Sequence, residues 1–296
     1  MSASQPDRKP RRFPLQLDQV ATVKSSGPKP APVAQTGARE LLRPQAHLQQ
    51  AEQDRRRHTT PQGVGMDSIH VRRRMVERLM QDGISHQHVL DAFARVPRHL
   101  FVDTALVNQA YEDTSLPIGL GQTISKPSVV AAMMQLLCVR PGLQMHAEVT
   151  LTHKPLGQCL EIGSGCGYQA ALLGHLSRRV VSIERLKDLH LKARANLNTM
   201  RQHLPEWPDV RLVYGDGMIG HAPLAPYDTI IAAAGGSALP QAWIDQLAPG
   251  GRLVAPLEEP RGGTQVLTIL DRLPDGSLQH SRAGAVLFVP LKSGTT

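Results

Sequence analysis

The stretch that decides the fold of this chain reads Leu160-Glu161-Ile162-Gly163-Ser164-Gly165-Cys166-Gly167-Tyr168. It has the pattern of an apolar strand, a glycine loop and the start of a helix. Glycines let the loop backbone turn sharply and let a bound nucleoside approach closely, where any Cβ would clash. Glycine turns also join strands to helices for purely structural reasons, so this stretch alone favours a ligand no more than an ordinary turn.

The residues that follow alternate between strand and helix patterns. Strands are predicted at 158–162, 180–183, 210–214, 229–233 and 252–256, and helices at 168–176, 186–200 and 240–247. Such alternation indicates a parallel sheet covered on both faces. Two later apolar runs, at 264–270 and 285–289, flank the turn Pro274-Asp275-Gly276 and predict an antiparallel pair at the sheet edge. The predicted class is therefore α/β, with a Rossmann-like, mostly parallel sheet and an antiparallel C-terminal edge.

Helices are also expected ahead of the sheet. Apolar residues at helical spacing predict a helix from about residue 68 to Gly83, a second at 86–95, and a third that opens at Lys126-Pro127 and runs to Cys138. Residues 98–124 contain several glycines and polar residues, and we expect irregular structure there.

Acidic residues follow the next two predicted strands. Glu184 ends the second strand, where a carboxylate can accept hydrogen bonds from both hydroxyls of a ribose. Asp216 and Gly217 follow the third strand; the carboxylate could accept from an adenine amino group while a backbone N–H donates to the ring. Each has a plainer interpretation, Glu184 as a helix cap and Asp216-Gly217 as an ordinary turn. Together with the glycine loop they favour an adenosine ligand.

The identity of that ligand stays open on spacing alone. Gly165-Cys166-Gly167-Tyr168-Gln169-Ala170 also satisfies the dinucleotide pattern G-x-G-x-x-A, so an NAD-dependent dehydrogenase competes. Two features argue against it. Glu161 lies at the end of the first strand, where its acidic side chain would repel a pyrophosphate but tolerate the ammonium group of a cationic ligand. The sheet also ends in an antiparallel pair rather than in a second complete nucleotide-binding half.

The first 65 residues differ from the rest. They contain eight prolines and, with 11 Lys/Arg against 5 Asp/Glu, carry +6 of the formal net charge of +8. We expect a disordered basic tail over 1–65, helical in places within 38–57, and one folded domain over 66–296. A basic tail suggests at most a weak, salt-sensitive contact with polyanions, so no specific nucleic-acid partner is predicted.

The cysteines and the apolar runs bound the location. Cys138, Cys159 and Cys166 are odd in number and match no zinc spacing, which predicts a reducing compartment without disulfides or a metal site. No run approaches the roughly 20 apolar residues that span a bilayer, so no membrane partner is expected. The cytoplasm is the predicted location.

If the adenosine ligand is a methyl donor, the loop after the fourth predicted strand bears on which atom accepts the methyl group. Enzymes that methylate base amino groups hold the flipped base with a polar-Pro-Pro-aromatic stretch there, and the loop Ala232-Ala233-Ala234-Gly235-Gly236 lacks it. No cysteine follows a proline, so the nucleophile arrangement of cytosine C5 methylation is missing as well. An oxygen acceptor outside nucleic acid is therefore favoured.

From Met75 onward the chain resembles the protein-L-isoaspartate (D-aspartate) O-methyltransferases. The matching blocks include Leu116-Pro117-Ile118-Gly119-Leu120-Gly121-Gln122-Thr123-Ile124-Ser125, Leu160–Tyr168, Ser182-Ile183-Glu184-Arg185, Gly215-Asp216-Gly217 and Phe288-Val289-Pro290-Leu291, along with Arg95-Val96-Pro97-Arg98. They cover about three quarters of the chain in family order, and Gly-Gln-Thr-Ile-Ser with a proline two residues further on is specific to this family.

The resemblance implies that 66–296 is a methyltransferase domain with S-adenosylmethionine as cofactor. The implied substrates are damaged proteins containing L-isoaspartyl, and also D-aspartyl, residues. Ser125 is implied as the active-site serine, with a cap of the following helix as its other interpretation. The implied cofactor residues are Glu161, Gly163, Gly165, Gly167, Glu184, Asp216 and Gly217.

The chain departs from the family pattern in three places: the tail, about a dozen extra residues around 143–156, and the glycine-rich loop Ala234-Gly235-Gly236-Ser237. Two other functions stay open: a related methyltransferase with another carboxylate acceptor, and a nucleic-acid-associated protein that works through its basic tail. The oligomeric state is not predicted.

Removal of residues 1–65 should leave methyl transfer nearly intact, because their proline and charge content gives them neither core nor pocket residues. Steady-state rates of the truncated and full-length proteins measure this. A truncated protein that folds but loses most of its activity would place the tail in the catalytic unit.

Overall fold

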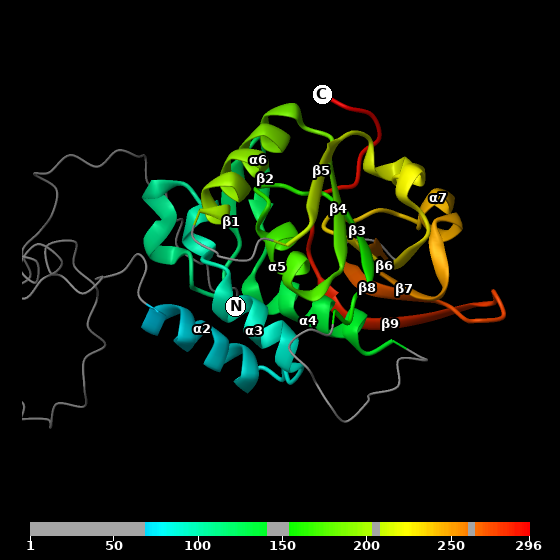
Figure 1. The fold of residues 1–296 in the computed structure, drawn as a ribbon, viewed down its shortest axis with the longest axis horizontal. Coiled ribbons are helices and arrows are strands. Elements are labelled where there is room, and N and C mark those ends of the chain that lie inside the picture. Colours follow the sequence, from blue (N-terminus) through cyan, green and yellow to red (C-terminus); the bar gives the residue numbers. More distant parts are fainter. Residues whose placement is uncertain (1–68, 141–153, 203–207, 260–263) are drawn as a thin grey trace, which may run out of the picture. The chain divides into compact units, whose positions relative to one another are not determined.

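A seven-stranded sheet with the order β5-β4-β3-β6-β7-β8-β9 organises the computed structural model (Figure 1). The first five strands in that order run parallel, and β8 and β9 are each antiparallel to the preceding strand. This confirms the predicted mostly parallel sheet with an antiparallel C-terminal edge. The strands are β3 (Gln158–Ile162), β4 (Arg179–Glu184), β5 (Val210–Tyr214), β6 (Tyr227–Ala232), β7 (Leu247–Glu258), β8 (Gln265–Arg272) and β9 (Leu278–Val286).

The structure describes residues 69–140, 154–202, 208–259 and 264–296. All of them belong to one compact unit, Thr59–Thr296. The predicted disordered tail, its helical parts and most of the extra residues around 143–156 lie outside the described residues.

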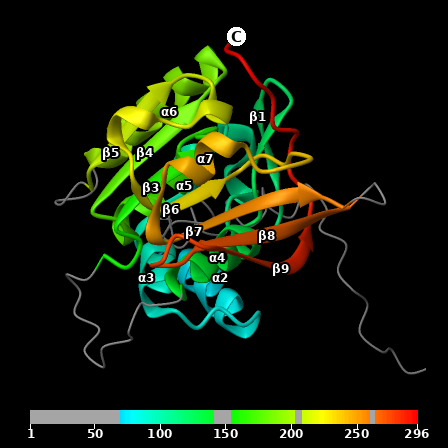
Figure 2. The same ribbon diagram turned by 90° about the vertical axis from the view of Figure 1, so that its right-hand side faces the viewer.

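Helices cover both faces of the sheet (Figure 2). Five of them share one large apolar cluster with a face of the sheet, which includes Cys159, Val180 and Ile231. The opposite face, which includes Leu160 and Ile230, packs against Trp243 of α7. The helices are α2 (Ile69–Gln81), α3 (Gln87–Arg95), α4 (Pro127–Cys138), α5 (Tyr168–Leu176), α6 (Lys187–Arg201) and α7 (Gln241–Asp245). Among the described helices, none combines the length and apolar character needed to cross a membrane.

Two regions differ from the sequence prediction. Residues 98–124, expected to be irregular, form 3₁₀ turns at Arg98–Phe101 and Thr104–Gln109 and a hairpin of β1 (Leu116–Gly119) and β2 (Gln122–Ile124). Strands this short show too little alternation to be recognised. The last strand ends at Val286 instead of beginning near it, because β9 is an edge strand with mostly exposed side chains and hence no apolar run.

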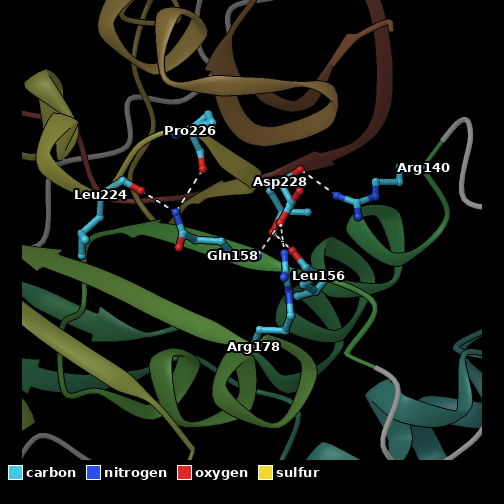
Figure 3. Close-up of polar contacts among 8 residues, drawn as sticks. Arg140, Leu156, Gln158, Arg178, Leu224, Pro226 and Asp228 are labelled. Carbon is cyan, nitrogen blue, oxygen red and sulfur yellow. Dashed lines mark hydrogen bonds and ion pairs between the residues drawn. The ribbon is translucent and has the colours of Figure 1, made fainter.

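Polar contacts fix the amino ends of the central strands (Figure 3). Asp228 of β6 accepts a hydrogen bond from the Gln158 N–H of β3 at 2.7 Å and one from Arg178 at 3.1 Å, while Arg140 donates to its backbone oxygen at 2.8 Å. Gly157 has a φ of +62°, and a Cβ there would lie 2.1 Å from Asp228 Oδ2. Only glycine leaves room for this carboxylate, which ties β3 to β6 and leaves their carboxyl ends free.

A buried ion pair reinforces the pairing of β7 with the antiparallel edge. Arg252 of β7 makes a bidentate contact with Asp271 of β8, at 2.6 and 2.8 Å. Its remaining Nη1 donates to the backbone oxygens of Leu136 and Val139, both at 2.8 Å, at the end of α4. The pair therefore satisfies the last carbonyl groups of a helix and aligns two strands at once.

Candidate active site

A cavity of about 450 Å³ opens at the carboxyl ends of the parallel strands. It lies where the strand order reverses between β3 and β6, the position at which open α/β sheets bind ligands. Its walls come from the loop after β3, the end of β4, the β1–β2 hairpin, the residues after β6 and the C-terminal segment 289–292. Five predicted site residues line it: Ser125, Gly163, Gly165, Glu184 and Gly217.

The loop after β3 has left-handed backbone at Gly163, Gly165 and Gly167, with φ of +92°, +55° and +90°. The N–H groups of Gly163 and Ser164 donate to the Ile183 oxygen at 2.9 and 3.1 Å, which fixes the loop to β4. Gly167 does not line the cavity; a Cβ there would lie 3.3 Å from Ala193 of α6. It therefore serves close helix packing, while Gly163 and Gly165 leave the cavity wall free of side chains.

Glu184 is 6% exposed, and both of its carboxylate oxygens are used. Oε2 accepts from the Gly165 N–H at 2.8 Å, and Oε1 accepts from the Leu186 N–H at 2.9 Å. Leu186 is itself the N-cap of α6, so Glu184 lies outside the helix and does not cap it in the predicted manner. Each oxygen keeps a second lone pair for a ligand in the cavity.

Glu161 does not line the cavity, contrary to the prediction. It is fully buried and pairs in register with Ser182 of β4, so both side chains lie on the same face of the sheet. Ser182 Oγ donates to its carboxyl group and lies 2.5 Å from Ser164 Oγ in the glycine loop. Glu161 thus supports the loop from behind.

Burial gives Glu161 an unusual charge state. Desolvation raises its pKa to about 8, although the hydrogen bond from Ser182 opposes the shift. The carboxyl group therefore carries a proton for the most part at pH 7. It presents no fixed negative charge to the cavity, so it would not repel a pyrophosphate there, contrary to the expectation from its position in the sequence.

Asp216 also lies outside the cavity wall. Its Oδ1 accepts from the Met218 N–H at 2.8 Å and its Oδ2 from the Gly294 N–H at 2.6 Å. The adjacent Gly217 does line the cavity, and a Cβ there would lie 2.6 Å from Ile162 Cγ2. Asp216 shapes the turn and holds the C-terminal segment, so its contact with adenine stays a prediction.

Ser125 follows β2 and faces the cavity. The N-cap of α4 is Lys126, and Ser125 caps nothing. Asp113 takes that role instead, accepting from the N–H and the hydroxyl of Ser128 at 2.9 and 2.8 Å. Within the described residues no hydrogen bond involves Ser125 Oγ, so its hydroxyl is available to a ligand.

Arg98 was not identified as a site residue from the sequence. It is fully buried, and its Nη2 donates to the backbone oxygen of Ser125 at 2.9 Å and, more weakly, to that of Thr114 at 3.4 Å. Its guanidinium carbon lies 4.9 Å from the ring centroid of Tyr168. Burial lowers its pKa. Arg98 therefore joins the two ends of the β1–β2 hairpin and fixes the backbone of Ser125. The sequence feature that could have identified it is its place in the Arg95–Arg98 block, which matches the family.

The C-terminal segment is the other wall that the sequence did not reveal. Gly235 pairs with it in both directions, donating to Val289 at 2.8 Å and accepting from Leu291 at 2.7 Å. A Cβ at Gly235 would lie 2.4 Å from Gln265, which explains the glycine in this loop. Thr296 then exchanges backbone hydrogen bonds with Arg185 and Lys187 at 3.0 and 2.9 Å, so the segment crosses back to the start of α6 (Figure 1).

A mostly parallel sheet with an antiparallel edge and a glycine-lined cavity at the strand switch point is the arrangement of the class I methyltransferases, which use S-adenosylmethionine. The family model described as protein-L-isoaspartate(D-aspartate) O-methyltransferase matches residues 70–296. The chain belongs to this family. Similar curated relatives are protein-L-isoaspartate O-methyltransferases from Methylibium petroleiphilum, 56% identical over the whole of both chains, and from Leptothrix cholodnii, 53% identical over all of this chain and 98% of that one.

Solved structures agree with this assignment. A protein-L-isoaspartate O-methyltransferase structure is 26% identical, with a TM-score of 0.62 over 75% of this chain and 66% of that one. A related crystal structure from Plasmodium falciparum, in complex with S-adenosyl-L-homocysteine, is 25% identical, with a TM-score of 0.60 over 74% of this chain and 96% of that one.

The Glu161→Gln variant tests the buried carboxyl group. Because the folded-state pKa of about 8 lies above the ordinary value of 4.5, the stability that the proton contributes is present at low pH and is lost as pH rises through 8. The free energy of unfolding of the wild type should therefore fall between pH 5 and 8 relative to that of Glu161→Gln, measured by urea titration.

Asp275→Asn is the matched control. Hydrogen bonds from Ser277 lower the pKa of this exposed carboxyl group, so it does not titrate between pH 5 and 8. Parallel stability curves for wild type and Glu161→Gln would show that Glu161 is ionised in the folded protein.

Proposed function

We propose that the chain transfers the methyl group of S-adenosylmethionine to the free α-carboxylate of L-isoaspartyl residues in damaged proteins, and that Ser125 positions this carboxylate. The observation that carries the proposal is the Ser125 hydroxyl, which faces the glycine-lined cavity without a partner among the described residues. Family membership and the relatives' activity support the reaction and the substrate class.

The residues present fit the cofactor. Left-handed Gly163 and Gly165 leave a wall without side chains, against which a nucleoside can lie. Glu184 has free lone pairs for the ribose hydroxyls, and Gly217 lines the cavity without a side chain. The cofactor supplies an electrophilic methyl group on a sulfonium sulfur.

The chain's own contribution to the chemistry is mainly positional. A carboxylate is already ionised at neutral pH and needs no strong general base. The Ser125 hydroxyl donates a hydrogen bond to one of its oxygens and leaves the other free to react. Arg98 holds the Ser125 backbone, and a preorganised donor of this kind costs no reorganisation during the reaction.

The proposed catalytic unit is 66–296, with the basic tail outside it. The family model begins at residue 70, in agreement with this boundary, although two relatives align with the whole chain. Cys138, Cys159 and Cys166 are free and buried, and burial raises the pKa of each thiol, as suits a protein of the reducing cytoplasm.

The wild type should methylate an isoaspartyl peptide far faster than the same peptide with aspartate, because a misplacement of the reacting oxygen by about 1 Å costs on the order of a hundredfold in rate. Ser125→Ala should lower kcat strongly but leave the affinity for the cofactor unchanged. Some activity should survive, since the carboxylate is itself a competent nucleophile.

Ser128→Ala is the matched control, because its hydroxyl bonds to Asp113 and does not line the cavity. It should lower stability but keep turnover. Equal rates on the two peptides would indicate another carboxylate acceptor, and normal turnover of Ser125→Ala would remove that residue from the mechanism.

A further inference from the structure

The two-residue loop Leu120-Gly121 at the tip of the β1–β2 hairpin has positive φ at both positions, as such a turn requires, but one of them is a leucine. Gly119, Leu120 and Gly121 have φ of +102°, +53° and +68°, so three successive residues are left-handed. Leu120 is the one non-glycine residue with positive φ in the part of the chain that the structure describes. An L-amino acid with a branched side chain is strained in this conformation, where glycine or asparagine is not.

Folding does not explain the choice of leucine. The side chain of Leu120 is 58% exposed, so burial offsets little of the strain. A Cβ added at Gly119 or Gly121 would meet nothing within 4 Å, which shows that the tip extends into open space. Backbone strain that side-chain burial does not offset is typical of residues at ligand-binding sites and active sites.

The base of the same hairpin is held firmly. Arg98 bonds the backbone at both ends, and Lys192 of α6 donates to the Ile118 oxygen at 2.9 Å. The Ile118 side chain is buried, and its Cδ1 would lie 3.1 Å from a Cβ on Gly165. The base of the hairpin is therefore fixed relative to Ser125 and the glycine loop, and the tip extends from it.

Leu120 and Ser125 line the same cavity, Leu120 as its exposed edge. When the reacting carboxylate of a peptide contacts Ser125, the rest of the peptide must extend out of the cavity. The residues next to the isoaspartyl residue then pass the exposed residues that line the cavity. The C-terminal segment adds the apolar residues Val289 and Leu291 to this wall. An apolar contact at the tip gains free energy only from an apolar partner.

On the basis of the proposed function, we propose that Leu120 is a specificity-determining residue that packs against the side chain next to the isoaspartyl residue and favours substrates in which this neighbour is apolar. The strained tip thus selects among damaged sites by their sequence context.

The experiment compares isoaspartyl peptides that differ only in having leucine or serine next to the isoaspartyl residue. One pair of peptides varies the residue before it, and a second pair varies the residue after it. The wild type should prefer a leucine peptide by roughly three- to tenfold in kcat/KM, as expected for partial burial of one leucine side chain. Leu120→Asn should abolish the preference by raising KM for that peptide. The change should fall mainly on KM rather than on kcat, and the Tm of the variant should be equal or higher because the strain is relieved.

Leu278→Asn is the matched control, an exposed leucine of β9 outside the cavity, and it should keep the preference. A wild type that treats the leucine and serine peptides alike, or a Leu120→Asn enzyme that keeps the preference, would overturn the role of Leu120 while the methyltransferase assignment stands. A wild type that methylates none of the isoaspartyl peptides would overturn both.

Discussion

Two backbone N–H groups, of Gly165 and Leu186, share the carboxylate of Glu184 at the edge of the sheet. One belongs to the glycine loop after β3 and the other to the start of α6, so a single side chain joins two segments that line the cavity. Hydrogen bonds to a charged group contribute about 1.5–3 kcal/mol each, more than the usual neutral bond. The left-handed glycines could take many conformations, and this carboxylate selects the one that the cavity needs.

The two ends of the strands have different tasks. At the amino ends, Asp228 is fully engaged with β3 and with two arginines, which makes that edge a fixed support. At the carboxyl ends, backbone and hydroxyl groups face an open cavity. Ser125 is fixed from behind through its backbone by Arg98, so that its hydroxyl stays free for a substrate. Rigid support at a distance and free donors at the site are what catalysis by positioning requires.

Sequence patterns predicted the elements that have strong periodicity or clear boundaries. The bounds of β3 and α5 match their predictions, because the glycine loop marks the end of one and the start of the other. The hairpin was missed because its strands span only four and three residues. The C-terminal wall was missed because its contact with Gly235 joins residues far apart in the chain.

The site residues show the same limit. Gly163, Gly165, Glu184, Gly217 and Ser125 were predicted, and they meet at one cavity. Glu161 at a strand end and Asp216 after a strand were placed there by the family resemblance, but strand register and a distant backbone donor direct their carboxyl groups elsewhere. A linear pattern shows which residues reach the edge of a sheet, and only packing decides which way each side chain points.

Calorimetric titration of the wild type and of Glu184→Gln tests the central role of Glu184 most directly. The ligands are S-adenosylhomocysteine and an analogue that lacks both ribose hydroxyls, and thermal unfolding confirms that each protein is folded. We expect that loss of the hydroxyls weakens binding to the wild type by about tenfold or more, and binding to Glu184→Gln far less. Equal affinity of the wild type for the two ligands would contradict this role of Glu184.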